Sequence, residues 1–315
     1  MPAFLGIDTS NYTTSAALYV SDSARMVSKK LLLPVKSGSC GLRQSDAVFL
    51  HVQQIEGVVR SALEEVKVCP AAVGVSTSPR DTEGSYMPCF SVGRAIAGVL
   101  SAAYGVPLYT FSHQVGHLAA ALYSTNRPDL FEHAFLALHL SGGTTDLLHV
   151  TPDAERVFRV RQIGGSMDLK AGQAIDRIGV MLGLSFPCGP DLEALAEKAD
   201  KSFLPRPFIK GTSCAFSGLE NQAQKMLSDR ESPANIARYT LDFVSASIAG
   251  ICKAASDAFA GIPFLFAGGV MSNRSLKRMA EEQFGGVVAT PEYSSDNAAG
   301  IAYLSRFVYK KNNML

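Results

Sequence analysis

Alternating apolar and polar runs divide the chain into two similar halves. The first half opens with apolar runs at Ala3–Asp8, Ser15–Val20 and Met26–Leu33, separated by polar turns, a pattern typical of a three-stranded meander. Helical and strand-like periodicities then alternate. We expect a helix over Ser45–Val66, a strand over Ala72–Ser76, a helix over Ser91–Tyr104, a strand near Leu108 and a helix over His113–Ser124.

A second start follows the break at Asn126–Asp129. The expected elements are strands over Ala134–Leu140, Asp146–Val150 and Val157–Ile163, helices from Asp168 to Ala260, a strand over Pro263–Ala267, a helix from Ser272 and a last helix from about Asp296. In each half a strand ends in a hydroxyl-rich turn, at residues 8–14 and 141–146, and a second strand returns. One such turn alone indicates an ordinary hairpin. Two at corresponding places favour a cleft whose backbone N–H groups and hydroxyls hold phosphate oxygens.

This duplication predicts an α/β, two-domain fold of the actin/sugar-kinase/Hsp70 (ribonuclease H-like) type with a central cleft. We expect an N-terminal domain over residues 1–127, with the last helix, about 296–312, packed back on it. The C-terminal domain is expected over residues 128–295, with a helical insertion over about 168–260.

Composition supports a folded protein and gives little attraction to nucleic acid. Of the 315 residues 47% are apolar and 18% charged, which is enough to bury sizeable cores, and the net charge is +1. Any RNA must therefore be held by a local basic patch, for which Lys170, Arg177, Arg206, Lys210, Lys277 and Arg278 are candidates, or by another subunit.

The six cysteines are scattered without metal-finger spacing, which favours a reducing compartment. The N-terminal apolar run is too short for a signal peptide, and no stretch approaches ~20 uninterrupted apolar residues. We expect a cytoplasmic protein.

A histidine pair is the clearest candidate for chemistry. His113 and His117 lie four residues apart on an expected helix, so both imidazoles project from one face and are able to share a metal. A capping or packing pair shows the same spacing. The residues between them include no glutamate, so a zinc-peptidase base is missing. Asp296 is the best candidate for a third, oxygen ligand, and it is also a candidate N-cap of the last helix.

Two further segments are ambiguous on their own. Gly268 and Gly269 end a strand before a helix, which lets a ligand approach the backbone and face the helix N-terminus. Asp176 is placed either to accept hydrogen bonds from ribose hydroxyls or to be a solvated helix carboxylate.

Seven segments in order resemble motifs of the TsaD family, also known as YgjD, Gcp and O-sialoglycoprotein endopeptidase (peptidase M22). The resemblance covers nearly the whole chain. The segments are Ser112–Leu118 (NHxxGHL), Leu138–Thr145 (LVSGGHT), Ala171–Arg177 (AGEAFDK), Phe186–Pro190 (YPGGP), Phe216–Leu219 (FSGLK), Ala267–Arg274 (GGVxxNR) and Ser295–Ile301 (TDNGAMI).

This resemblance implies a specific activity. Such proteins transfer a threonylcarbamoyl group from threonylcarbamoyl-AMP to N6 of the adenosine beside the anticodon of tRNAs that read codons beginning with A. By position, His113, His117 and Asp296 would ligate iron or zinc. The adenylate, threonylcarbamoyl-AMP or ATP/AMP, would contact His139, Leu140, Ser141, Gly142, Gly143, Asp176, Gly189 and Asn273. The resemblance assigns no catalytic acid or base. Partner subunits would bring the tRNA, and a homodimer or a TsaB-like heterodimer is expected.

The chain also departs from the family pattern. The first turn reads roughly GIETSCDETS in the family, whereas Tyr12 and Thr13 stand here in place of the acidic pair. The loop GVVPExASRxH is matched only at Gly41 and His51, the segment Ser78–Arg80 replaces a GPG type, and Thr144 replaces a histidine. These departures indicate a divergent paralogue.

Three alternatives to the transferase therefore stay open. A non-catalytic, nucleotide-binding relative acting as a regulatory or dimerising subunit is favoured by the lost carboxylates. An actin-fold kinase or ATPase is supported by the two turns, although such kinases do not need the histidine pair. A glycoprotein endopeptidase rests on the older family name and lacks a glutamate base.

Overall fold

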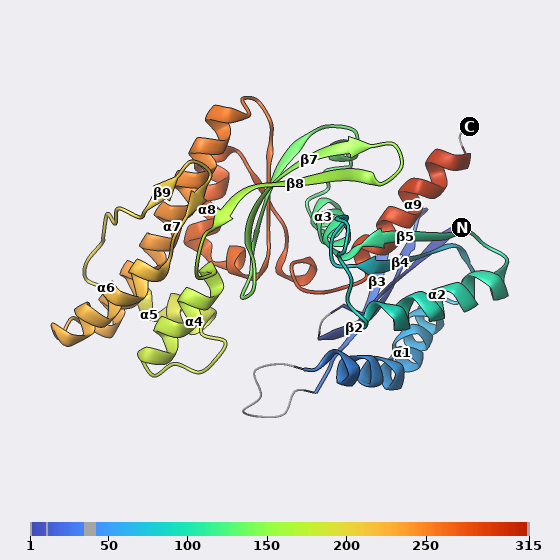
Figure 1. The fold of residues 1–315 in the computed structure, drawn as a ribbon, viewed down its shortest axis with the longest axis horizontal. Coiled ribbons are helices and arrows are strands. Elements are labelled where there is room, and N and C mark those ends of the chain that lie inside the picture. Colours follow the sequence, from blue (N-terminus) through green and yellow to red (C-terminus); the bar gives the residue numbers. More distant parts are fainter. Residues whose placement is uncertain (1, 11, 35–41, 314–315) are drawn as a thin grey trace. The chain divides into compact units, whose positions relative to one another are not determined.

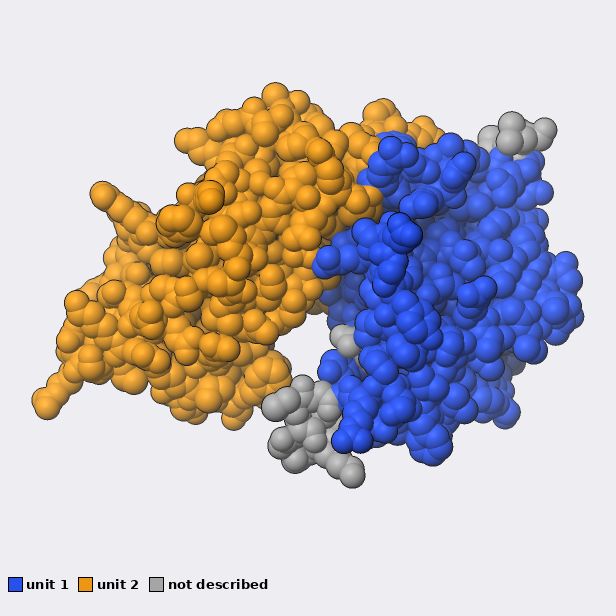
Figure 2. Space-filling model, viewed as in Figure 1, with its two compact units in different colours: residues 1–131, 152–159, 292–315 blue, residues 132–151, 160–291 orange. Residues whose placement is uncertain are grey.

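The computed structural model describes residues 2–10, 12–34 and 42–313, and it contains two β-sheets (Figure 1). The predicted motif match at Gly41 and the cysteine Cys40 lie outside the described residues. The chain divides into two compact units, coloured separately in Figure 2. Unit 1 comprises residues 1–131, 152–159 and 292–315, and unit 2 comprises residues 132–151 and 160–291.

The sheet of unit 1 is a meander extended by two parallel strands. Its strand order is β3-β2-β1-β4-β5, with β1 antiparallel to β2 and parallel to β4. The strands are β1 (Ala3–Asp8), β2 (Thr13–Val20), β3 (Arg25–Leu32), β4 (Pro70–Ser78) and β5 (Leu108–Ser112). Every residue of β1 and β2 is buried, which fits strands covered on both faces.

Helices cover both faces of this sheet. On one face, α1 (Gln44–Val66) and α2 (Phe90–Tyr104) enclose an apolar core with β1, β2 and β4. On the other face, α9 (Ala299–Asn313) packs on β1, β2 and β4, and α3 (His113–Ser124) packs on α9. Gly6 permits this packing, because a Cβ there would lie 2.4 Å from the backbone nitrogen of Ala302.

Unit 2 repeats the same strand arrangement within a larger sheet. The order β8-β7-β6-β11-β12 matches β3-β2-β1-β4-β5 of unit 1, and β10 and β9 extend it beyond β8. The strands are β6 (Phe135–Leu140), β7 (Thr145–Asp153), β8 (Val157–Ser166), β9 (Ile209–Lys210), β10 (Ser213–Cys214), β11 (Phe264–Ala267) and β12 (Val287–Val288). A large core lies between one face of this sheet and the helices α4 (Ala171–Met181), α5 (Gly189–Ala196), α6 (Ser217–Ser228), α7 (Pro233–Ala258) and α8 (Arg274–Phe284). Single turns of 3-10 helix lie at η1 (Pro128–Phe131), η2 (Gly269–Ser272) and η3 (Pro291–Tyr293).

The structure corrects the prediction in two places. The last helix begins at Ala299 rather than near Asp296, and Asn297 caps it by accepting a hydrogen bond from the backbone N–H of Ala299 at 2.9 Å. The span 168–260 is interrupted by the short strands β9 and β10, and β10 pairs parallel with β8. None of the described helices is both long and apolar enough to span a lipid bilayer.

Candidate metal centre

Helix α3 presents two imidazoles on one face. Its N-cap is Ser112, whose hydroxyl accepts a hydrogen bond from the backbone N–H of Val115, so the helix begins at His113. Four residues later, the Nε2 atom of His117 lies 2.9 Å from the Nε2 atom of His113. Two imidazole nitrogens this close repel each other unless a proton or a cation lies between them.

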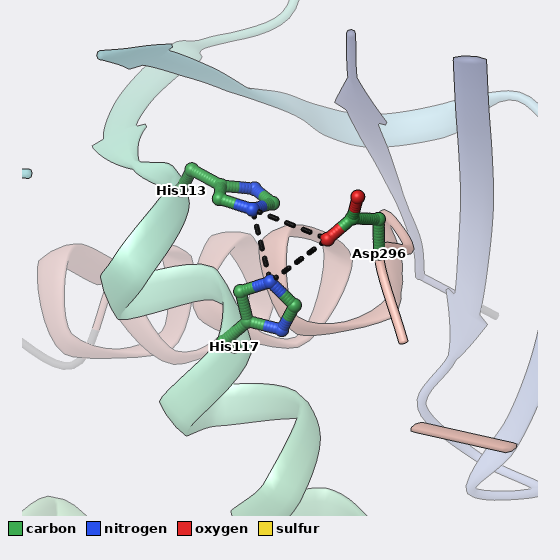
Figure 3. A group of neighbouring side chains, drawn as sticks. All are labelled: His113, His117 and Asp296. Atoms are coloured by element: carbon green, nitrogen blue, oxygen red, sulfur yellow. Dashed lines mark hydrogen bonds and ion pairs between the residues drawn. The ribbon is translucent and has the colours of Figure 1, made fainter. Parts of the chain in front are cut away.

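Asp296 completes a group of three from the segment that precedes α9 (Figure 3). Its Oδ1 atom lies 3.2 Å from Nε2 of His117 and 3.5 Å from Nε2 of His113. The segment is able to lie close to α3 because Gly300 has no side chain. A Cβ at Gly300 would lie only 1.8 Å from the carbonyl oxygen of Gly116. Backbone contact between two helices therefore brings residues distant in the sequence together.

The three ligand atoms fit one divalent ion. A metal–nitrogen distance of about 2.0–2.1 Å places neighbouring ligands about 3.3 Å apart in a tetrahedron and about 2.9 Å apart in an octahedron. The observed separations of 2.9, 3.2 and 3.5 Å cover this range. Two histidines and one carboxylate leave open coordination positions, which is typical of catalytic zinc and of non-haem iron.

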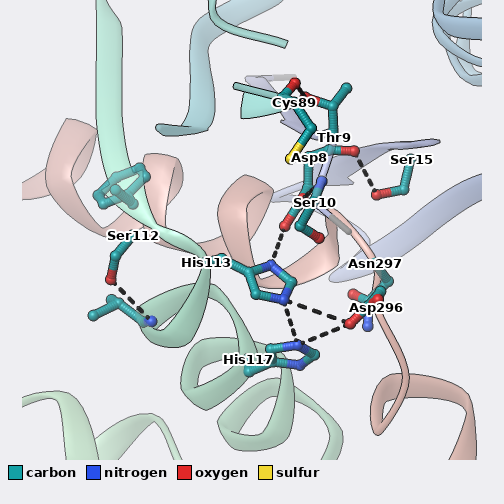
Figure 4. A network of polar contacts seen from close by, with 12 residues as sticks. Asp8, Thr9, Ser10, Ser15, Cys89, Ser112, His113, His117, Asp296 and Asn297 are labelled. Atoms are coloured by element: carbon teal, nitrogen blue, oxygen red, sulfur yellow. Dashed lines mark hydrogen bonds and ion pairs between the residues drawn. The ribbon is translucent and has the colours of Figure 1, made fainter. Parts of the chain in front are cut away.

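A second carboxylate, Asp8, lies next to His113 (Figure 4). It is the last residue of β1 and is 1% exposed, and its Oδ2 atom lies 2.6 Å from Nδ1 of His113. Its Oδ1 atom accepts a hydrogen bond from the backbone N–H of Ser10 at 2.7 Å. Sequence reasoning did not single out Asp8; its place at the end of a buried strand, in the first hydroxyl-rich turn, was the available signal.

The carboxylates and the imidazoles shift one another's pKa values. Burial acts to lower the pKa of His113, but the charges of Asp8 and Asp296 outweigh it and raise that pKa to about 10. Burial acts to raise the pKa of Asp296, and hydrogen bonds from His113 and His117 hold it well below its usual range. The pKa of Asp8 is likewise lowered, chiefly by the charge of His113 against the effect of burial. Without a metal, the centre therefore holds a cationic imidazole between two anions.

The residues expected to contact an adenylate all lie in unit 2. His139 and Leu140 end β6, and the turn Ser141–Gly143 leads into β7. The Leu140 side chain is fully buried in the core, so only its backbone is available to a ligand. Helix α4 lies tightly against the turn, since a Cβ at Gly172 would be 2.6 Å from the carbonyl oxygen of Ser141.

The other three expected contacts lie on helices of unit 2. Asp176 is in α4, Gly189 begins α5 and Asn273 is the N-cap of α8. Asp176 accepts a hydrogen bond from the backbone N–H of Cys188 at 2.8 Å, next to Gly189 at the start of α5. Asn273 caps α8 through hydrogen bonds from two backbone N–H groups, each at 3.1 Å. The side chains of Asp176 and Asn273 therefore have structural roles whether or not a ligand binds.

The sequence suggested that a ligand approaches the backbone closely at Gly268. In the structure, the backbone of Leu140 makes this close approach. Gly268 has φ +100°, and a Cβ there would lie 2.1 Å from the carbonyl oxygen of Leu140. Sequence reasoning also missed Asp146, which is 5% exposed, accepts a hydrogen bond from Gln162 at 3.1 Å and is paired in register with His139. A carboxylate inside a buried strand was the available signal.

A model of one protein family, described as tRNA N6-adenosine threonylcarbamoyltransferase, matches residues 41–303. The chain belongs to the TsaD family.

Solved structures show the fold of this TsaD-family chain. Component A of (R)-2-hydroxyglutaryl-CoA dehydratase from Acidaminococcus fermentans matches with a TM-score of 0.55 and 17% identity, covering 99% of this chain and 100% of that one. HypF from T. kodakarensis matches with a TM-score of 0.63 and 12% identity, covering 99% of this chain and 48% of HypF. The activator of 2-hydroxyisocaproyl-CoA dehydratase from Clostridium difficile has a TM-score of 0.50 at 11% identity, covering 99% and 97%. The expected duplicated actin/sugar-kinase/Hsp70 fold is confirmed.

One departure from the TsaD pattern lies within the first strands. Thr13, which stands in place of an acidic residue, is 4% exposed at the start of β2. The next residue, Thr14, hydrogen-bonds through its hydroxyl to Nδ1 of His51 at 2.7 Å and to Gln54 at 2.9 Å. His51, one of the two matched positions of the divergent loop, is fully buried in α1 and supports the strand that carries the first turn.

Proposed function

We propose that this protein transfers a threonylcarbamoyl group from threonylcarbamoyl-AMP to N6 of the adenosine beside the tRNA anticodon. The observation that carries the proposal is the convergence of His113, His117 and Asp296 in a chain of the TsaD family. Similarity to the family alone would not separate a transferase from a relative that has lost its chemistry. A compact set of two imidazoles and one carboxylate supports retained chemistry, since its geometry suits a metal with open positions.

The reaction exchanges one bond to the carbamoyl carbon for another. The bond between that carbon and a phosphate oxygen of AMP breaks, and AMP leaves with the electron pair. A bond from the carbon to the adenosine N6 forms, and the amine gives up one proton to water. Negative charge develops on the carbonyl and phosphate oxygens in this process. Iron or zinc held by His113, His117 and Asp296 would supply Lewis-acid stabilisation of that charge.

The chain's own residues bind and orient the adenylate in this proposal. We expect the backbone N–H groups and hydroxyl of the turn Ser141–Gly143 to receive the phosphate. The neighbouring N-termini of α4 and α8 favour negative charge, and Asp176 accepts from the ribose. A HypF structure described as bound to phosphate and nucleotide has a TM-score of 0.60 at 12% identity, covering 99% of this chain and 46% of HypF, and this likeness is consistent with a nucleotide ligand.

Binding of tRNA is assigned to partner subunits in this proposal. With a net charge of +1, the chain lacks a global attraction for RNA. Among the candidate basic residues, Arg177 pairs with Glu220 at 3.0 Å, and Lys277 lies 3.9 Å from Glu281, so both charges are partly neutralised. A homodimer or a heterodimer with a TsaB-like chain would supply the missing surface.

One observation favours a second candidate, a non-catalytic nucleotide-binding subunit. Tyr12 and Thr13 remove two carboxylates from the first turn, and such carboxylates are natural candidates to take the proton from the amine. This candidate predicts nucleotide binding without turnover.

A reconstitution separates the two candidates. The protein is incubated with threonylcarbamoyl-AMP, a tRNA that reads codons beginning with A, partner subunits and Fe²⁺ or Zn²⁺, and the tRNA nucleosides are analysed by mass spectrometry. We expect threonylcarbamoyladenosine with the wild type and at least about 100-fold less with His117→Ala, because that variant loses one of three ligands. Adenylate binding by calorimetry without product would instead support the non-catalytic subunit. ATP hydrolysis that persists in His113→Ala would support a kinase or ATPase.

A further inference from the structure

The buried carboxylate of Asp8 is fixed from two sides. Its Oδ1 atom accepts the backbone N–H of Ser10 at 2.7 Å, and its Oδ2 atom lies 2.6 Å from Nδ1 of His113 (Figure 4). The residue ends β1, which is paired on both sides, with β2 and with β4. Neither the backbone nor the side chain of Asp8 is therefore free to move away from the imidazole.

This contact determines which nitrogen of His113 faces the other ligands. A carboxylate accepts but does not donate, so the atom facing it, Nδ1, must carry a proton. In the neutral ring the lone pair is then on Nε2. Nε2 is the atom that lies 2.9 Å from Nε2 of His117 and 3.5 Å from Oδ1 of Asp296.

We propose that Asp8 is a positioning residue of the metal centre: it fixes the ring of His113 and its tautomer so that Nε2 is presented to the ion. The inference rests on the metal site of the proposed function and adds a residue that does not itself touch the metal. Partners of this kind raise the basicity of the ligand and contribute about 10- to 100-fold to metal affinity. The role requires a negative, acceptor-only group, which distinguishes it from simple packing.

The test is Zn²⁺ affinity, measured with the full chain by competition against a chromophoric chelator. We expect Asp8→Asn to bind Zn²⁺ about 10- to 100-fold more weakly than the wild type, because an amide NH₂ facing the imidazole favours the wrong tautomer. Asp8→Glu keeps the charge and should stay within about 5-fold of the wild type.

Asp168→Asn is the matched control. Asp168 accepts hydrogen bonds from the backbone N–H groups of Phe216 and Ser217 at 2.8 and 3.0 Å, and it lies in unit 2. This change also removes a carboxylate that holds backbone groups, but it should leave Zn²⁺ affinity unchanged. An equal loss in both variants would assign the effect to general destabilisation and overturn the proposal.

A second readout does not depend on whether the variants fold. Long-range ¹H–¹⁵N spectra of the Zn²⁺-loaded wild type should show His113 protonated at Nδ1 and bound to the metal through Nε2. Binding through Nδ1, or an Asp8→Asn variant with wild-type affinity, would overturn the role of Asp8. A wild type that binds no Zn²⁺ or Fe²⁺ would instead refute the metal site itself, so the two failures are distinguishable.

Discussion

At the scale of single residues, His113 is the histidine of the candidate centre that contacts both carboxylates. It lies between Asp8 and Asp296, and its side chain is 18% exposed. These two carboxylates stabilise either a bound cation or a protonated imidazole. The same residues therefore link metal binding to proton binding, and the metal-free protein should show this linkage in its stability.

We predict that the metal-free protein loses stability as the pH rises from 6.5 to 9.5. The pKa of His113 is raised to about 10 in the folded state, from 6.5 in an unfolded chain. The contribution of the protonated His113 to the stability of the folded protein is fully present below pH 6.5 and is lost as the pH rises towards 10. Over this window the free energy of unfolding should fall by roughly 2–4 kcal/mol. Urea titrations in EDTA would measure the change.

The variant His113→Gln provides the comparison for this pH dependence. It lacks the titrating group, so its stability should vary much less over the same window, although it starts lower at pH 6.5. A wild type whose stability is as flat as that of the variant would show that the imidazole is not charged in the metal-free protein.

The residue types at the centre were partly predictable from the sequence. The spacing of His113 and His117 predicted a shared face, and Asp296, which precedes the expected last helix, was the best candidate for an oxygen ligand. Asp8 was not predicted, because its role depends on strand β1 ending beside α3, 105 positions away in the chain. A contact between residues so far apart in the chain produces no periodic pattern of apolar and polar residues in the sequence.

At the scale of elements, the crossing of α3 and α9 positions the centre. Gly116 lies between the two histidines on α3, and Gly300 lies in the first turn of α9, four residues after Asp296. The glycines meet without side chains between them, since a Cβ at Gly300 would overlap the carbonyl oxygen of Gly116 at 1.8 Å. The distance between the helices therefore sets the distance from carboxylate to imidazoles.

We predict that Gly300→Ala weakens both the fold and the metal site. The new methyl group must push α9 away from α3, which should cost about 1–3 kcal/mol of unfolding free energy. Asp296 would move with α9, so Zn²⁺ affinity should fall by at least about 10-fold. Chemical denaturation and chelator competition would measure the two effects.

Gly57→Ala is the matched control for this substitution. Gly57 is exposed in the middle of α1, and a Cβ there would meet no atom within 4 Å. Alanine in an open helical position should stabilise the protein by up to about 1 kcal/mol and leave the metal affinity unchanged. Wild-type Zn²⁺ affinity in Gly300→Ala would show that the helix contact does not position the ligands.

The strands of the two meanders were predicted to within three residues at each end, because polar turns bound their apolar runs. Strands β9, β10 and β12 were not predicted, since each has two residues and cannot show a period. The start of the last helix was misplaced because Asp296 and Asn297 are both good N-caps, and only the three-dimensional contacts of Asp296 assign that role to Asn297.

At the scale of the whole molecule, the two units carry different parts of the proposed chemistry. His113, His117, Asp296 and Asp8 belong to unit 1, whereas all residues expected to contact the adenylate belong to unit 2. A metal held by unit 1 residues should therefore stabilise unit 1 selectively, by about 2.7 kcal/mol when the free ion is at 100 times its dissociation constant.

Buried cysteines allow this difference to be measured unit by unit. Cys89 is buried in unit 1, whereas Cys188, Cys214 and Cys252 are buried in unit 2. Burial raises the pKa of the Cys214 thiol to about 12 and also raises that of Cys252, so these thiols should react only after their surroundings open. Among the described cysteines, exposed Cys69 should react in the native protein.

We predict that Zn²⁺ protects Cys89 against thiol labelling in urea much more than it protects the three cysteines of unit 2. Peptide-resolved mass spectrometry after a labelling pulse would give a urea midpoint for each thiol, with and without the ion. Zn²⁺ should raise the midpoint of Cys89 and leave the others nearly unchanged, because the ion binds only folded unit 1. His117→Ala, which lacks a ligand, should show no shift at Cys89. Equal protection of all four thiols would mean that the units unfold together or that unit 2 also contributes a ligand, and either result would contradict a metal held by unit 1 alone.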